Sequence, residues 1–228
     1  MRFPKLLSKG ISKNSGRNNS GKITCRHKGG GHSKKLRLLG LSKKAFGSYS
    51  IISFHYDPFR NVSLALVQHS ESKLYSFVLN TSGIEVGNSF SFSSQSNVTY
   101  SELLPGTRCF VSSFPLGSFL HDVDCKYAKS AGSFCTLVQK SDKFCFIRLS
   151  SGVIKKVSSF VFASYGKVGN ERFYLKNLFK AGQSRWIGKR PTVRGVAINP
   201  VDHPHGGGEG KSSGGRPSVS PWGWLTKK

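Results

Sequence analysis

Residues 49–80, YSIISFHYDPFRNVSLALVQHSESKLYSFVLN, decide the fold class. They contain three short runs rich in β-branched and aromatic residues, at 49–57, 62–69 and 73–80, separated by the turn-prone segments DPFRN and SES. Similar short runs continue beyond them, punctuated by Pro-Gly, KSDK and SSG turns. Many short strands at regular spacing are typical of small barrels or sandwiches. The sequence therefore predicts a mainly β protein made of two small barrels.

One helix is expected outside the β pattern. The segment NERFYLKNLFKAG, residues 170–182, has helical periodicity, and Gly182 is expected to end the helix. From Ala181 onward the chain is rich in Gly and Pro, yet it holds all three Trp residues of the protein. Such a segment cannot bury a core of its own, so we predict an arm that becomes ordered against a partner surface.

The charge is large and unevenly distributed. The 228 residues include 35 Lys and Arg against 10 Asp and Glu, a net charge of +25. Residues 1–47 hold 13 cations and no acid, residues 57–171 hold 11 cations and 8 acids, and residues 172–228 hold 11 cations and 2 acids. A nearly neutral middle with basic ends indicates a folded core whose cationic extensions bind a polyanion. The sequence has no apolar run of 18 residues, so we expect no membrane span.

RNA is the expected polyanion. Glycines allow the backbone to approach phosphates, cations meet phosphates in succession, and Trp, His and Arg planes stack on unpaired bases. No recognition helix for a DNA major groove is evident. The first 19 residues are basic and acid-free, which suits an RNA-binding arm and an organellar presequence equally.

The C-terminal segment also contains residues that suit other chemistries. His203, His205 and Glu209, with Asp202 as a fourth ligand or supporting group, could form the metal centre of a hydrolase. HGGG and GKSSG, at 205–208 and 210–214, match esterase motifs but lie in one Gly/Ser loop without the required strand and helix. The five cysteines form no C-x-x-C pair, so reduced and partly buried thiols are expected.

Two long motifs carry a resemblance. GRNNSGKITCRHKGGGH (16–32) and RWIGKRPTVRGVAINPVDHPHGGGEG (185–210), followed by PSVSPWG (217–223), closely resemble the bacterial-type ribosomal protein L2 family of the large subunit. Shorter stretches between these motifs also match the family, in the same order: YDPFRNVSLALV, LPGTRCFVSSFPLGS, KSAGS, RLSSGVIKKV and GKVGN. The resemblance covers nearly the whole chain from Gly16.

The resemblance implies a division of the chain and a role. It implies a basic N-terminal extension at 1–32, an OB-fold-like RNA-binding barrel at 33–106, an SH3-like barrel at 107–180 and an extended basic arm at 181–228. The arms would enter large-subunit rRNA near the peptidyl transferase centre and support subunit assembly, subunit association and tRNA binding. Neighbouring ribosomal proteins would be further partners. His203 and His205 match the family's paired histidines, whose implied role is to contact rRNA and organise the loop, not to act as bases.

The expected rRNA-binding residues are Arg17, Lys22, Arg26, His27, Lys28, His32, Lys34, Lys35, Arg37, Arg185, Trp186, Lys189, Arg190, Arg194, Asn199, His203, His205, Gly206, Gly207, Gly208, Lys211, Arg216 and Trp222. We expect no enzymatic activity and no cofactor other than rRNA-associated Mg²⁺. Strands heavy in Ser and Phe favour a mitochondrial ribosome over a plastid or bacterial one. A non-ribosomal RNA-binding factor stays an open alternative.

Overall fold

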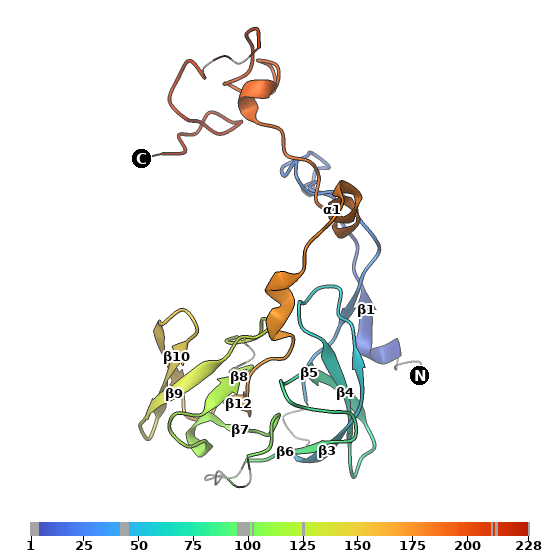
Figure 1. Ribbon diagram of the computed structural model, residues 1–228, viewed down its shortest axis with the longest axis vertical. Helices are drawn as coiled ribbons and strands as arrows, with labels where there is room; N and C mark the ends of the chain where they lie inside the picture. Colours follow the sequence, from blue (N-terminus) through green and yellow to red (C-terminus); the bar gives the residue numbers. More distant parts are fainter. Residues whose placement is uncertain are drawn as a thin grey trace. The chain divides into compact units, whose positions relative to one another are not determined.

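The computed structural model describes residues 5–41, 46–94, 101, 103–124, 126–210, 212 and 214–227. The chain divides into two units, each made of two separate segments (Figure 1). Met1–Ser12 and Lys34–Asn177 form the first, called the sheet unit below. Lys13–Ser33 and Leu178–Lys228 form the second, called the arm unit.

The sheet unit is built from strands, which confirms the mainly β class. Its elements are η1 (Lys5–Leu7), β1 (Ser8–Gly10), β2 (Lys35–Arg37), β3 (Gly47–His55), β4 (Leu64–His69), β5 (Tyr75–Leu79), β6 (Ser89–Phe92), β7 (Arg108–Phe110), η3 (Val111–Ser113), β8 (Phe119–His121), β9 (Cys135–Lys140), β10 (Phe144–Leu149), β11 (Ile154–Ser158), β12 (Phe162–Tyr165) and η4 (Glu171–Leu175). The strands β1 and β2 pair with each other. The others form one sheet in the order β11-β10-β9-β8-β12-β7-β6-β3-β4-β5. This arrangement is consistent with an OB-fold followed by an SH3-like barrel.

The strand β4 shows why the first half of the sheet unit, which contains β3 to β6, folds as it does. Its side chains alternate between the two faces of the sheet. Ala65 and Val67 join one buried cluster, while Leu64 and Leu66 join another on the opposite face. Both faces of β4 are therefore covered, and pairing with β3 and β5 satisfies its backbone on both edges.

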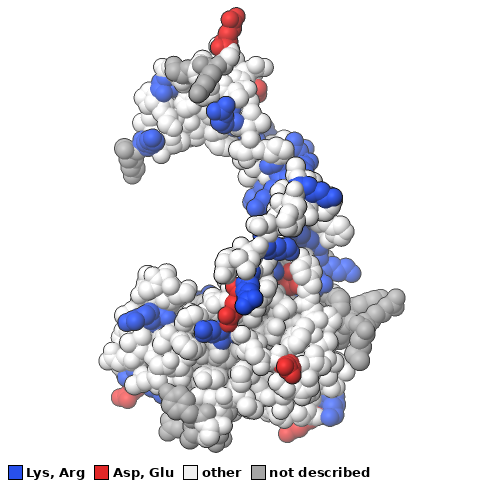
Figure 2. Space-filling view, viewed as in Figure 1, with Lys and Arg blue, Asp and Glu red and all other residues white. Residues whose placement is uncertain are grey.

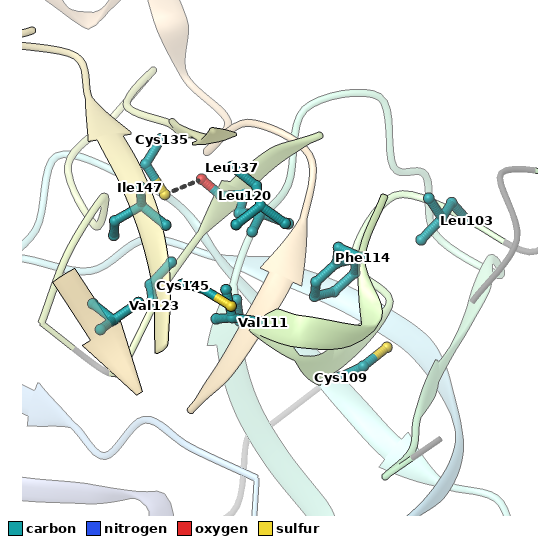
Figure 3. Packing of buried hydrophobic residues seen from close by; sticks show 12 residues of the cluster. Leu103, Cys109, Val111, Phe114, Leu120, Val123, Cys135, Leu137, Cys145 and Ile147 are labelled. Carbon is teal, nitrogen blue, oxygen red and sulfur yellow. Dashed lines mark hydrogen bonds between the residues drawn. The ribbon is translucent and has the colours of Figure 1, made fainter. Parts of the chain in front are cut away.

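The second half surrounds a separate core. Phe114, Leu120 and Ile147 are fully buried in it, together with three cysteines (Figure 3). Cys135 donates a hydrogen bond from Sγ to the Leu120 carbonyl oxygen at 3.2 Å, and burial raises the pKa of its thiol to about 12. The expectation of reduced thiols is confirmed for the described cysteines: Cys109, Cys135 and Cys145 are buried and Cys25 is half-buried. Cys125 lies outside the described residues.

A buried histidine joins the two halves of the sheet unit. His121 Nδ1 lies 3.1 Å from the Gly166 carbonyl oxygen, which can only accept, so Nδ1 carries the proton. The other ring nitrogen, Nε2, then accepts from the Thr81 hydroxyl at 3.2 Å. Beside it Arg108 donates to Asp122 at 2.8 Å. Thr81 lies between β5 and β6 in the first half, and the other residues belong to the second, so this polar network fixes one half against the other.

The prediction of one helix over residues 170–182 is wrong. The chain forms a short 3₁₀-helix, η4, and becomes extended at Lys176. A second, separate helix, α1 (Ala181–Ile187), contains Gly182 instead of ending there. Tyr174 is 79 % exposed and Phe179 is 88 % exposed, so a continuous helix would have no apolar surface to cover. No helix among the described residues is long and apolar enough to cross a membrane.

Candidate nucleic-acid interface

Two segments far apart in the sequence, Lys13–Ser33 and Leu178–Lys228, pair to make the arm unit (Figure 1). The Gly29 N–H donates to the Gly188 carbonyl oxygen (2.8 Å), and the Arg190 N–H donates to the His27 carbonyl oxygen (3.0 Å). Between these bonds Lys28 and Lys189 are antiparallel partners. The pairing was not expected from the sequence, which treated the two basic ends as separate arms.

Glycine permits the close approach of the two segments. Gly31 has φ +60°, and a Cβ there would lie 2.7 Å from the Trp186 carbonyl oxygen and 2.8 Å from the Gly188 nitrogen. The next residue, His32, donates its N–H to the same Trp186 carbonyl at 2.9 Å. The helix α1 ends at Gly188, whose left-handed backbone (φ 99°) turns the chain into the pairing segment. These glycines allow two backbone segments of the protein to approach each other. Amino-acid composition alone does not distinguish this role from close contact with phosphate.

The paired histidines organise a loop. His203 is 8 % exposed, its Nδ1 accepts the His205 N–H at 3.0 Å, and the two rings lie 4.8 Å apart. The His203 ring occupies the space beside Gly195, where a Cβ would come within 2.6 Å of it. Burial lowers the pKa of His203, and the neighbouring His205 and Arg26 lower it further. His203 is therefore a neutral packing group at the centre of this loop.

His205 connects that loop to the end of the chain. Its Nε2 lies 3.3 Å from both the Pro217 carbonyl oxygen and the Val219 nitrogen. Val219 in turn pairs with Leu225 in a turn of chain that presents two tryptophans, Trp222 at 67 % and Trp224 at 75 % exposure. The ring nitrogens of the histidine pair thus contact backbone groups of the protein and hold this part of the chain together.

The described residues of this loop do not bring a set of metal ligands together. Within the part of the chain that the structure describes, no three His, Cys, Asp or Glu side chains lie close enough to hold a metal ion. Glu209 is exposed, while His203 and His205 direct ring nitrogens at backbone groups. The hydrolase alternative is not favoured.

Most of the expected rRNA-binding residues fall in the arm unit. Those are Arg17, Lys22, Arg26, His27, Lys28, His32, Arg185, Trp186, Lys189, Arg190, Arg194, Asn199, His203, His205, Gly206, Gly207, Gly208, Arg216 and Trp222. Lys34, Lys35 and Arg37 belong to the sheet unit, the last two in β2. Lys211 lies outside the described residues.

The arm unit is strongly cationic. It holds 14 Lys and Arg and only two acids, Asp202 and Glu209. None of the ion pairs between described residues falls within it. Figure 2 shows Lys and Arg side chains gathered on the segments around α1, and more thinly over the strands. These charges are available to an external polyanion.

Sequence reasoning missed two groups in this unit. Lys180 places its ammonium 5.6 Å from the centre of the Trp186 ring, a cation–π distance that positions the exposed indole. Trp224 is exposed and lies two positions after Trp222, but it is not among the residues predicted from the sequence. Its presence among the chain's three tryptophans was the available signal for it.

Comparison with known proteins agrees with the resemblance. "Ribosomal Proteins L2, RNA binding N-terminal domain" matches residues 4–91, and "Ribosomal Proteins L2, C-terminal domain" matches residues 105–223. The "Large ribosomal subunit protein uL2" of a Wolbachia species (strain wRi) is 42 % identical over 98 % of this chain and 82 % of its own length. Those of Blochmanniella pennsylvanica and Orientia tsutsugamushi are 42 % and 38 % identical, over 99 % and 98 % of this chain. The chain belongs to the ribosomal protein L2 family.

Proposed function

We propose that the protein is a structural constituent of the large ribosomal subunit and binds its rRNA through the arm unit. One observation carries this proposal: two distant segments converge on a unit with 14 cations, two acids and three exposed tryptophans. A folded domain with this charge balance gains stability from a polyanion and repels itself without one. Family membership supports the same assignment, and it supports a role without enzymatic activity.

The chemistry of binding follows from the residues. Exposed cations such as Arg17, Arg26 and Arg194 neutralise phosphates and release counterions, which supplies affinity but little sequence information. The exposed rings of Trp222 and Trp224 offer planes for unpaired bases. The chain passes between the sheet unit and the arm segments at three points, 12–13, 33–34 and 177–178, and the sheet unit has cores of its own. The sheet unit thus serves as a folded support from which the RNA-binding arm unit extends.

Finer features belong to the same proposal. The C-terminal segment would lie towards the peptidyl transferase centre and support subunit association and tRNA binding, with other large-subunit proteins as neighbours. We propose no cofactor beyond rRNA-associated Mg²⁺. The relatives named above are bacterial, which supports a bacterial-type ribosome. The mitochondrial location stays a hypothesis from composition, with plastid and bacterial cytoplasm as its alternatives, and cell fractionation of the source organism tests it.

Sedimentation tests the ribosomal assignment. The tagged full chain, expressed in its own cells, is expected to co-sediment with large subunits and with complete ribosomes after gradient centrifugation. A chain that ends at residue 177, which lacks the C-terminal segment of the arm unit, is expected in the light fractions while its sheet unit stays folded. Full-length protein found mainly in light fractions would instead support the non-ribosomal RNA-binding factor.

A further inference from the structure

The pairing of the two arm segments places like charges opposite each other. The bonds from Gly29 to Gly188 and from Arg190 to His27 flank Lys28 and Lys189, which makes the lysines a non-hydrogen-bonded antiparallel pair. In such a pair the Cα atoms are about 4.5 Å apart and the side chains are at their closest. Like charges directly opposite each other in this geometry are destabilising.

Two arginines add to the same place. Gly29 lies between them: its Cβ position is 3.3 Å from Arg185 Nη1 and 3.2 Å from Arg190 Cγ. Lys28, Arg185, Lys189 and Arg190, called the bridge cluster below, therefore gather around one short stretch of paired backbone. All four residues are exposed, and no ion pair between described residues involves any of them. The pairing itself consists of few backbone bonds, and α1 beside it has no buried residue, so little offsets the repulsion.

We propose that the bridge cluster is a binding site for phosphodiester groups of RNA, and that their binding is what closes the two arm segments onto each other. This inference rests on the proposed function, in which these four residues are already expected to contact rRNA, and adds a coupling between RNA binding and the pairing of the two segments. Phosphates between the facing cations convert repulsion into attraction, and pairing in turn assembles cations from both segments on one surface. Binding and pairing strengthen each other by the same factor, as linkage requires.

Amide hydrogen exchange on the full chain tests the coupling. The amides of Gly29, His32 and Arg190 bond across the pairing, whereas those of Thr24 and Gly188 bond within their own segments. On adding a single-stranded RNA oligonucleotide at low salt, the three cross-segment amides are expected to slow at least about tenfold more than the two local ones. Inorganic phosphate is expected to act weakly, and sodium chloride at equal ionic strength not at all.

Two glycine variants separate pairing from charge. Gly31→Ala inserts a Cβ against the Trp186 backbone, whereas Gly21→Ala puts the same residue at a similar φ of +77° with nothing within 4 Å. Neither changes the net charge. We expect Gly31→Ala to weaken RNA binding by about tenfold or more, and Gly21→Ala by about twofold or less. Unfolding of the sheet unit is followed in parallel, to show that it is unaltered.

A charge reversal tests the repulsion. Lys28→Glu places opposite charges across the pair, and the cross-segment amides of this variant are expected to be protected without RNA. Equal protection of the wild-type amides with and without RNA would overturn the coupling, as would RNA binding that leaves them unprotected. In both cases the proposed function survives, whereas a wild-type chain that fails to bind RNA at all contradicts the proposed function itself.

Discussion

Replacing Arg185, Lys189 and Arg190 together by Gln is expected to lower the affinity for large-subunit rRNA about 100-fold at 0.1 M salt. Each phosphate contact contributes about 0.7 to 0.9 to the slope of log affinity against log salt, so losing three contacts removes a little over two decades at this salt concentration. The slope itself is expected to become shallower by about two to three. Filter binding or fluorescence anisotropy over a range of salt concentrations measures both quantities.

A matched variant controls for total charge. Lys143, Arg148 and Arg172 are also one lysine and two arginines, all exposed, but they belong to the sheet unit. Their replacement by Gln is expected to change the affinity less than tenfold and the slope by less than one, as an effect of long-range charge alone. Equal losses in the two variants would mean that net charge, and not the arm unit, determines binding.

Acidification from pH 6.5 to pH 4 is expected to destabilise the sheet unit by about 3 kcal/mol through His121 alone. Burial lowers the pKa of His121 to about 4, against the smaller opposing effects of the Gly166 hydrogen bond and of Asp122. In the unfolded chain the same group takes up a proton near pH 6.5. Between these values the unfolded state binds more protons, so stability falls as the pH falls, and the full contribution is present above pH 6.5.

Urea unfolding of the full chain at pH 7 and pH 4.5 measures this effect. His121→Asn keeps a polar group beside Thr81 and Gly166 that does not titrate. The loss of unfolding free energy between pH 7 and pH 4.5 is therefore expected to be smaller in the variant than in the wild type, by about 2 to 3 kcal/mol. The variant is expected to be less stable at pH 7, because one of two buried hydrogen bonds is lost or distorted. The same pH dependence in both proteins would show that the buried imidazole is not the titrating group.

The strands could be predicted from the sequence, because their signal is local. The run at 49–57 and β3 at Gly47–His55 differ by two residues at each end, and β4 and β5 lie within the runs at 62–69 and 73–80. Apolar side chains at alternate positions are enough to identify such elements. The helix near residue 175 was placed wrongly, because its apolar residues have periodicity but no core to cover.

The arm unit could be predicted in composition but not in structure. The cations and tryptophans indicated RNA, yet nothing local shows that Gly29 bonds to Gly188 or that His205 Nε2 lies against Pro217 and Val219. A glycine suits contact with phosphate and contact with another backbone equally well. Pairing between residues more than 150 positions apart depends on the three-dimensional fit of the two segments, and a local sequence pattern does not indicate it.

Cross-linking of protein to RNA in intact large subunits tests directly whether the two arm segments contact rRNA. Subunits that contain the protein are irradiated with ultraviolet light, and the peptides that carry a nucleotide are identified by mass spectrometry. Cross-linked peptides are expected to concentrate in residues 13–33 and 178–228. Cross-links confined to the strands of the sheet unit, with both arm segments free of RNA, would contradict this expectation.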